Sequence, residues 1–188
     1  MFIKKGENKG HQVGTRESGK RGQMKMSFGM IFSLILIIVF LAFAFYIIAQ
    51  FLDMQRCAQS GKFIDELQKD VNNIWKSPEA NVNPDKPQYH LPDKVEEICF
   101  IDYSKDSSGR GPDREKYAEM QISRVTEKNL FFYPIDSGEC FDAVEIKHIN
   151  ISKITEQKNP YCIKNREGIK IPMKKNFEDN LVCLGDNC

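Results

Sequence analysis

The residues that could support chemistry in this 188-residue chain are its six cysteines and two of its three histidines, which all lie beyond residue 52. Zinc sites usually show paired Cys-x-x-Cys units, whereas the shortest spacing here is the four-residue gap between Cys183 and Cys188. A nucleophilic cysteine needs a basic partner, and only His90 and His148 are available in this part. We therefore expect up to three disulfides, with the pairing open but a small Cys183–Cys188 loop feasible. The candidate cysteines are Cys57, Cys99, Cys140, Cys162, Cys183 and Cys188.

Oxygen-bearing side chains give weaker signals. Asp102, Asp106 and Asp113 are spaced somewhat like a calcium loop, but Ser107 stands where that loop needs glycine, so we expect a solvated turn. Asn150 begins an Asn-Ile-Ser sequon and is a candidate glycosylation site. No carboxylate pair is marked as acid and base, and no glycine-rich phosphate loop or Gly-x-Ser-x-Gly turn occurs. We expect no enzymatic activity, no cofactor and no metal.

The chain that positions these residues is expected to be anchored in a membrane near its amino terminus. Residues 26–52 carry no charge, and a helix of this length exceeds the roughly 30 Å hydrocarbon core of a bilayer. Residues 1–25 hold seven Lys/Arg against two Asp/Glu, and such an excess marks the cytoplasmic side. We expect a single-pass protein with a cytoplasmic basic leader and an extracytoplasmic C-terminal domain, where cysteines can oxidise.

The helix is expected to continue beyond the span, over residues 53–76, in amphipathic form. Ile64, Leu67, Val71 and Ile74 share one face and form the candidate packing face. The opposite, polar face carries Lys62, Asp65, Glu66, Lys69, Asn72, Asn73 and Lys76. The apolar face favours packing under the domain's own sheet, with a coiled-coil dimer as the alternative because the spacing is also heptad-like.

The rest of the chain reads as a proline-rich linker, residues 77–92, followed by a β-rich domain, residues 93–188. Residues 165–168 are expected to form a hairpin turn, with Gly168 at positive φ. Over residues 144–154 the apolar phase shifts, so we expect a strand that contains a bulge or a change of strand there. The expected fold class is α+β, with a long N-terminal helix packed on an antiparallel sheet. The short β-prone runs are 98–101, 120–122, 130–133, 144–146, 161–163, 169–171 and 181–184.

This layout of basic leader, uncut hydrophobic helix, amphipathic extension and β-rich head resembles that of type IV pilins and pilin-like proteins, whose archaeal members often carry Lys-Gly-Gln at the cut site. The resemblance implies that prepilin peptidase cuts between Gly22 and Gln23, after Arg21. Pilins usually place Glu at the fifth mature position to neutralise the neighbouring amino terminus. This chain has Ser27 there, so a filament would lack that charge pair.

The expected function is that of a non-enzymatic, pilin-like component of the cell surface or of a membrane assembly. Its expected partners are the lipid bilayer and, through the N-terminal helix, further copies or other pilin-like subunits. The domain after residue 52 is mildly acidic, with 20 Lys/Arg against 24 Asp/Glu, and shows no basic patch with interleaved aromatics, so no nucleic-acid partner is expected. The alternatives are an uncleaved signal-anchor protein whose head binds a ligand or partner and, more remotely, a membrane-tethered hydrolase. A hydrolase predicts a cleft with clustered carboxylates, or His90 and His148 together.

Overall fold

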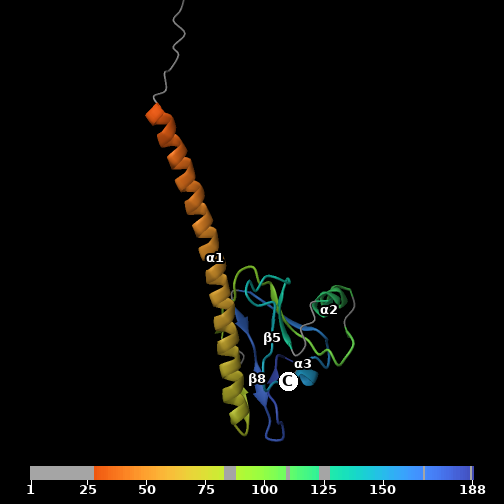
Figure 1. Cartoon of the computed structure of the whole chain (residues 1–188). Helices are drawn as coiled ribbons and strands as arrows, with labels where there is room; N and C mark the ends of the chain where they lie inside the picture. The colour runs from red at the N-terminus through yellow and green to blue at the C-terminus, as the bar shows by residue number, and fades with distance from the viewer. Residues whose placement is uncertain (1–27, 83–87, 109–110, 123–127, 167, 187) are drawn as a thin grey trace, which may run out of the picture. The chain divides into compact units, whose positions relative to one another are not determined.

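The computed structural model describes residues 28–82, 88–108, 111–122, 128–166, 168–186 and 188 (Figure 1). The chain divides into two compact units, up to Ala44 and from Phe45 to Cys188. Helix α1 (Phe28–Lys76) contributes to both. By length and composition it is able to cross a membrane, and none of its most apolar stretch is buried. The candidate cleavage residues Gly22 and Gln23 lie outside the described residues.

The second unit contains three antiparallel sheets, which confirm the expected α+β fold. The sheet orders are β1-β8-β9, β2-β7 and β5-β4-β3-β6. The strands are β1 (Ala80–Val82), β2 (Gln88–Tyr89), β3 (Glu97–Phe100), β4 (Leu130–Tyr133), β5 (Ala143–Val144), β6 (Tyr161–Lys164), β7 (Ile169–Lys170), β8 (Met173–Lys175) and β9 (Cys183–Leu184). Helices α2 (Pro112–Ile122) and α3 (Ile151–Ile154) complete the unit.

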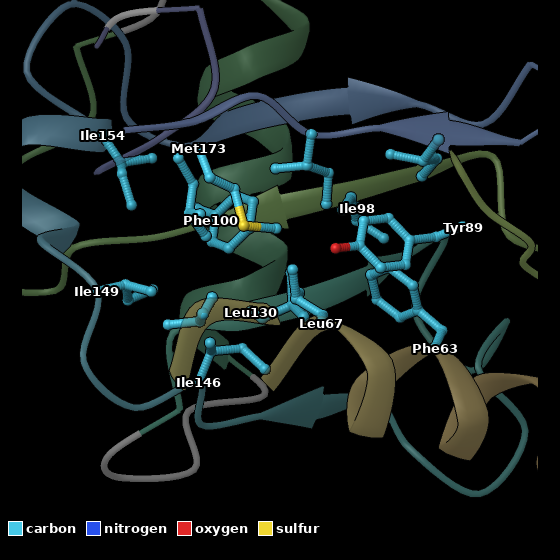
Figure 2. Packing of buried hydrophobic residues seen from close by; sticks show 14 of the residues in the cluster. Phe63, Leu67, Tyr89, Ile98, Phe100, Leu130, Ile146, Ile149, Ile154 and Met173 are labelled. Atoms are coloured by element: carbon cyan, nitrogen blue, oxygen red, sulfur yellow. The ribbon is translucent and has the colours of Figure 1, made fainter. Parts of the chain in front are cut away.

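Side chains alternate along the strands of the four-stranded sheet, so they point to both of its faces, and each face packs against a cluster of buried residues. Ile98 and Phe132 are cross-strand partners on the face that belongs to the main core. Figure 2 shows α1 side chains Phe63 and Leu67 within this core. The other face carries Cys99 and Phe131, which pack with residues that include Tyr117 and Met120 of α2.

Three local predictions are wrong. Residues 120–122 end helix α2 rather than forming a strand, because Pro112 with Asp113 and Glu115 makes a favourable first turn. The predicted 165–168 hairpin is not formed: β6 and β7 belong to different sheets, although Gly168 does have φ +112°. Of residues 144–154, for which a strand was predicted, only Val144 belongs to a strand, β5. The segment ends in helix α3, which Asn150 caps.

Segment 77–92, predicted as a linker, contributes β1 and β2. Strand β1 is an edge strand and β2 belongs to a two-stranded sheet, so neither is a central strand. This agrees with the effect of proline, which removes a ladder hydrogen bond. Tyr89 of β2 is nevertheless fully buried, and its ring meets Phe63 edge-on at 5.5 Å between centroids.

Candidate functional site

The candidate packing face of α1 lies inside the head. Leu67, Val71 and Ile74 are buried in the main core, and Ile64 packs against that core from its margin. The expectation that this face packs under the chain's own sheet is confirmed. The four residues are therefore covered within one copy of the chain.

A flank of α1 that includes Asn72 of the predicted polar face also contacts the head. Gln68 Oε1 accepts from the amide of Lys147 at 2.8 Å. Asn72 Oδ1 lies 3.0 Å from Nδ1 of His148. The His148 ring stacks on Trp75 with the centroids 3.8 Å apart. Polar contacts thus fasten the 147–148 turn to the helix beside the apolar core.

A disulfide between Cys57 and Cys140 attaches the head to the beginning of the amphipathic part of α1. Its surroundings add further contacts. Glu139 accepts from Lys94 at 2.6 Å and lies 3.8 Å from the guanidinium of Arg56. The Phe141 ring lies 3.5 Å from the position of a Cβ on Gly61. This tether begins five residues after Leu52, the last residue of the uncharged run.

The other cysteines also pair, Cys99 with Cys162 and Cys183 with Cys188, so all six are oxidised and the small terminal loop is formed. Cys99 and Cys162 are direct cross-strand partners in β3 and β6. Glu97 lies close enough to their sulfur atoms to suggest a metal site. However, the sulfurs are bonded to each other and Glu97 pairs with Lys116, so this oxidised arrangement does not offer three free ligands.

The calcium-like sequence around Asp102 is a hydrogen-bonded turn. One carboxylate oxygen accepts from the amide and hydroxyl of Ser104, and the other from the hydroxyl of Ser152 at 2.9 Å. Burial alone would raise the pKa of Asp102, but these hydrogen bonds and the nearby Lys105 lower it. Asn159 holds the backbone of Asp102 through its side-chain oxygen and nitrogen. The carboxylate oxygens are thus already engaged by the chain itself.

The candidate glycosylation residue Asn150 caps α3. Its Oδ1 accepts from the amide of Lys153 at 3.1 Å, and the sequon hydroxyl of Ser152 donates to Asp102. Asn150 is half-buried, whereas Ser152 is exposed. Modification of Asn150 remains a prediction from the sequence, and in the folded chain the sequon's polar atoms already have structural roles.

A cleft of about 580 Å³ lies between two segments that join different sheets. One segment, from the β2–β3 connection to the first residue of β3, provides Asp93, Glu96 and Glu97. The other, from the last residue of β6 into the β6–β7 connection, provides Lys164 and Arg166. The volume falls in the range of small-molecule sites. The cleft thus has an acidic wall and a basic wall.

The two histidines have separate surroundings. His90 lines the cleft, whereas His148 contacts Asn72 and Trp75. In the cleft Asp93 and Glu96 are both exposed, whereas Glu97 is half-buried and engaged by Lys116. The cleft therefore contains clustered carboxylates, but His90 and His148 are not together.

Comparisons with protein-family models, with curated proteins and with solved structures give no match to this chain. The functional conclusion therefore depends on the sequence and geometry of the chain itself. Sequence reasoning named the cysteines and the helix face, but it did not find the cleft. The two walls are separated by about 70 residues, and no local pattern links them.

Proposed function

We propose that the chain is a non-enzymatic, pilin-like component of the cell surface or of a membrane assembly. It is anchored in the bilayer by the first part of α1, with the amino terminus in the cytoplasm and the β-rich domain outside. The observation that carries this proposal is the division of α1. Residues 28–52 are exposed throughout and uncharged, whereas Phe63, Leu67 and Val71 are buried in the head.

The exposed part of α1 requires an apolar environment. Phe40 and Phe45 are each 68% exposed, and Ile38 is 65% exposed. Hiding one such side chain from water contributes about 1.5–3 kcal/mol, so a run of this length strongly favours lipid or other apolar helices. Gly29, Ser33, Ala42 and Ala44 permit close helix packing, which supports association with further copies or with other pilin-like subunits.

The orientation is supported by two independent features. The basic leader favours the cytoplasmic side, and three disulfides beyond the span favour an oxidising compartment. The covalent tether at Cys57 also supports an assembly role, because it fixes the head to the helix near the end of the uncharged run.

The test is the intact mass of the unreduced protein from its native membrane. Loss of residues 1–22 would support prepilin-type processing, and each disulfide would lower the mass by about two units. A Gly22→Val variant should remain full length if cleavage follows residue 22. Gly19→Val is the matched control and should be processed normally. A full-length wild-type mass would refute this mechanism.

A second candidate, an uncleaved signal-anchor protein with a ligand-binding head, is favoured by the charged cleft. It predicts retention of residues 1–22 and a monomer in detergent. The pilin-like proposal instead predicts helix-mediated oligomers, which chemical crosslinking in the membrane would detect.

A further inference from the structure

The cleft is lined by charges of opposite sign from two neighbouring segments. Asp93 and Glu96 come from the β2–β3 connection, and Lys164 and Arg166 from the end of β6 and the residues after it. All four side chains are exposed. Among the residues that the structure describes, none of the four forms an ion pair. Within the described residues, these four charged groups are therefore open to solvent at the cleft.

Glu97, in contrast, is a carboxylate of this cleft that has a positively charged partner. It is paired with Lys116, whose ammonium also lies 4.8 Å from the centre of the Tyr133 ring. This pair leaves Asp93 and Glu96 as the negative groups available to a ligand. The positive groups opposite them are a lysine and an arginine, and arginine forms paired hydrogen bonds to carboxylate or phosphate.

The walls are held in place by Asn165. Its amide donates to the carbonyl of Glu96 at 2.7 Å, and its side-chain nitrogen donates to the carbonyl of Val95 at 2.9 Å. Leu91 and Val95 are buried and give the cleft an apolar base. A site whose backbone is fixed in advance loses less free energy in ordering when a ligand binds.

We propose that this cleft binds a small zwitterion that carries an ammonium group and a phosphate or carboxylate group. The ammonium binds at the Asp93 and Glu96 wall, and the anionic group binds Lys164 and Arg166. A single exposed ion pair contributes little to the binding free energy. A ligand that contacts both groups of charges loses its translational and rotational freedom only once, so its two contacts add to the affinity. The binding chemistry does not depend on the pilin-like proposal.

Such a zwitterion has two possible sources, a soluble metabolite or a phospholipid headgroup. Lys94, which follows Asp93 in the sequence, shares Glu139 with Arg56. Arg56 is four residues beyond Leu52. If α1 is a membrane anchor, as proposed above, this end of the cleft lies near the headgroup layer, so only the lipid source rests on that proposal.

The test uses the full chain in a non-ionic detergent and isothermal titration with O-phosphoethanolamine. Inorganic phosphate and ethylamine serve as the two half-ligands. We expect O-phosphoethanolamine to bind more tightly than either half. Glu96→Gln should weaken its binding about tenfold and leave phosphate binding unchanged, whereas Arg166→Gln should weaken both, since a tenfold change is the loss of one charge-assisted contact.

Glu115→Gln and Arg114→Gln are matched controls, because both residues are exposed on α2 and do not line the cleft. They should bind as the wild type does. Absence of O-phosphoethanolamine binding to the folded wild type, or binding by both Glu96→Gln and Arg166→Gln that is as tight as that of the wild type, would overturn the proposal. Circular dichroism of each variant confirms that the fold is kept.

A second titration separates the two sources. The chain is placed in nanodiscs of phosphatidylethanolamine or of phosphatidylglycerol, and O-phosphoethanolamine is added to each. Weaker apparent binding in phosphatidylethanolamine discs assigns the cleft to a lipid headgroup. Equal binding assigns it to a soluble zwitterion, and loss of binding in both discs contradicts the proposal. A full-length mass would refute pilin-type processing without affecting any of these outcomes.

Discussion

Replacing Leu67 by alanine tests whether the amphipathic part of α1 belongs to the head's own core. Leu67 is fully buried, and truncation of a buried leucine removes transfer free energy and leaves a cavity. We expect the free energy of unfolding to fall by about 3 kcal/mol. Ile64 is only partly buried at the core margin, so Ile64→Ala should cost about 1 kcal/mol. Asp65→Ala, on the exposed face, should change stability by less than about 0.5 kcal/mol.

The only tryptophan provides the assay. Trp75 stacks on His148, and its indole nitrogen donates to the carbonyl of Asn180 at 3.1 Å. Separation of α1 from the head should therefore change its fluorescence. A urea titration of the full chain in detergent should show the Leu67→Ala midpoint lowered by roughly 1–3 M, given an m-value of about 1–3 kcal/mol/M.

The competing coiled-coil arrangement makes different predictions. In a dimer seam Ile64 and Leu67 would both face a partner helix, so their alanine variants would lose similar amounts of stability. The midpoint would also rise with protein concentration, since dissociation would accompany unfolding. Equal losses together with a concentration-dependent midpoint would refute the packing described here.

Three further predictions use the same titration. Replacing Cys57 and Cys140 by serine should lower stability by about 4 kcal/mol, because the bond closes a loop with a sequence separation of 83; an unchanged midpoint would contradict this. Gly138→Ala should cost about 2–3 kcal/mol, since a Cβ would lie 2.0 Å from the carbonyl oxygen of Phe141; a neutral effect would show that this loop moves freely. The pKa of Asp102 is lowered in the folded chain, so its carboxylate stabilises the fold at pH values above its ordinary pKa of 3.8. This stabilisation is lost as the pH falls through the pKa of the folded state. The Asp102→Asn variant should thus be less stable than the wild type at pH 7, and this difference in stability should shrink below about pH 4. A difference that stays constant with pH would contradict the stabilising role of the Asp102 carboxylate.

The sequence predicted those parts of the fold that depend on periodicity. The apolar spacing of Leu67, Val71 and Ile74 placed them on one side of a helix, and burial confirms that side. The same pattern placed Asn72 on the polar face but did not find its contact with His148, because a helical wheel separates apolar from polar residues and cannot show which polar residues have partners elsewhere in the chain. For residues 120–122, a local β preference outweighed the helix-start signal of Pro112, which was readable in the sequence.

Pairing between distant segments was beyond the sequence pattern. The six cysteines allow fifteen connectivities, and the choice follows from how β3 and β6 come together. Residues 165–168 read as a hairpin because turn residues lie between two β-prone runs. In the folded chain β6 pairs with β3 and β7 pairs with β2, and this separation opens the charged cleft between the two connections.

The position of the Cys57–Cys140 bond bears on which proposed function holds. Only Asp53, Met54, Gln55 and Arg56 lie between the uncharged run and the bonded cysteine, so the head has little chain with which to move away from the end of that run. A subunit of an ordered assembly needs this fixed attachment, because helix packing must also set the position of the head. A ligand-binding head on an anchor does not need it. Serine at both cysteine positions should therefore reduce crosslinked oligomers in the membrane while leaving O-phosphoethanolamine binding intact. Loss of binding with oligomers retained would reverse this assignment.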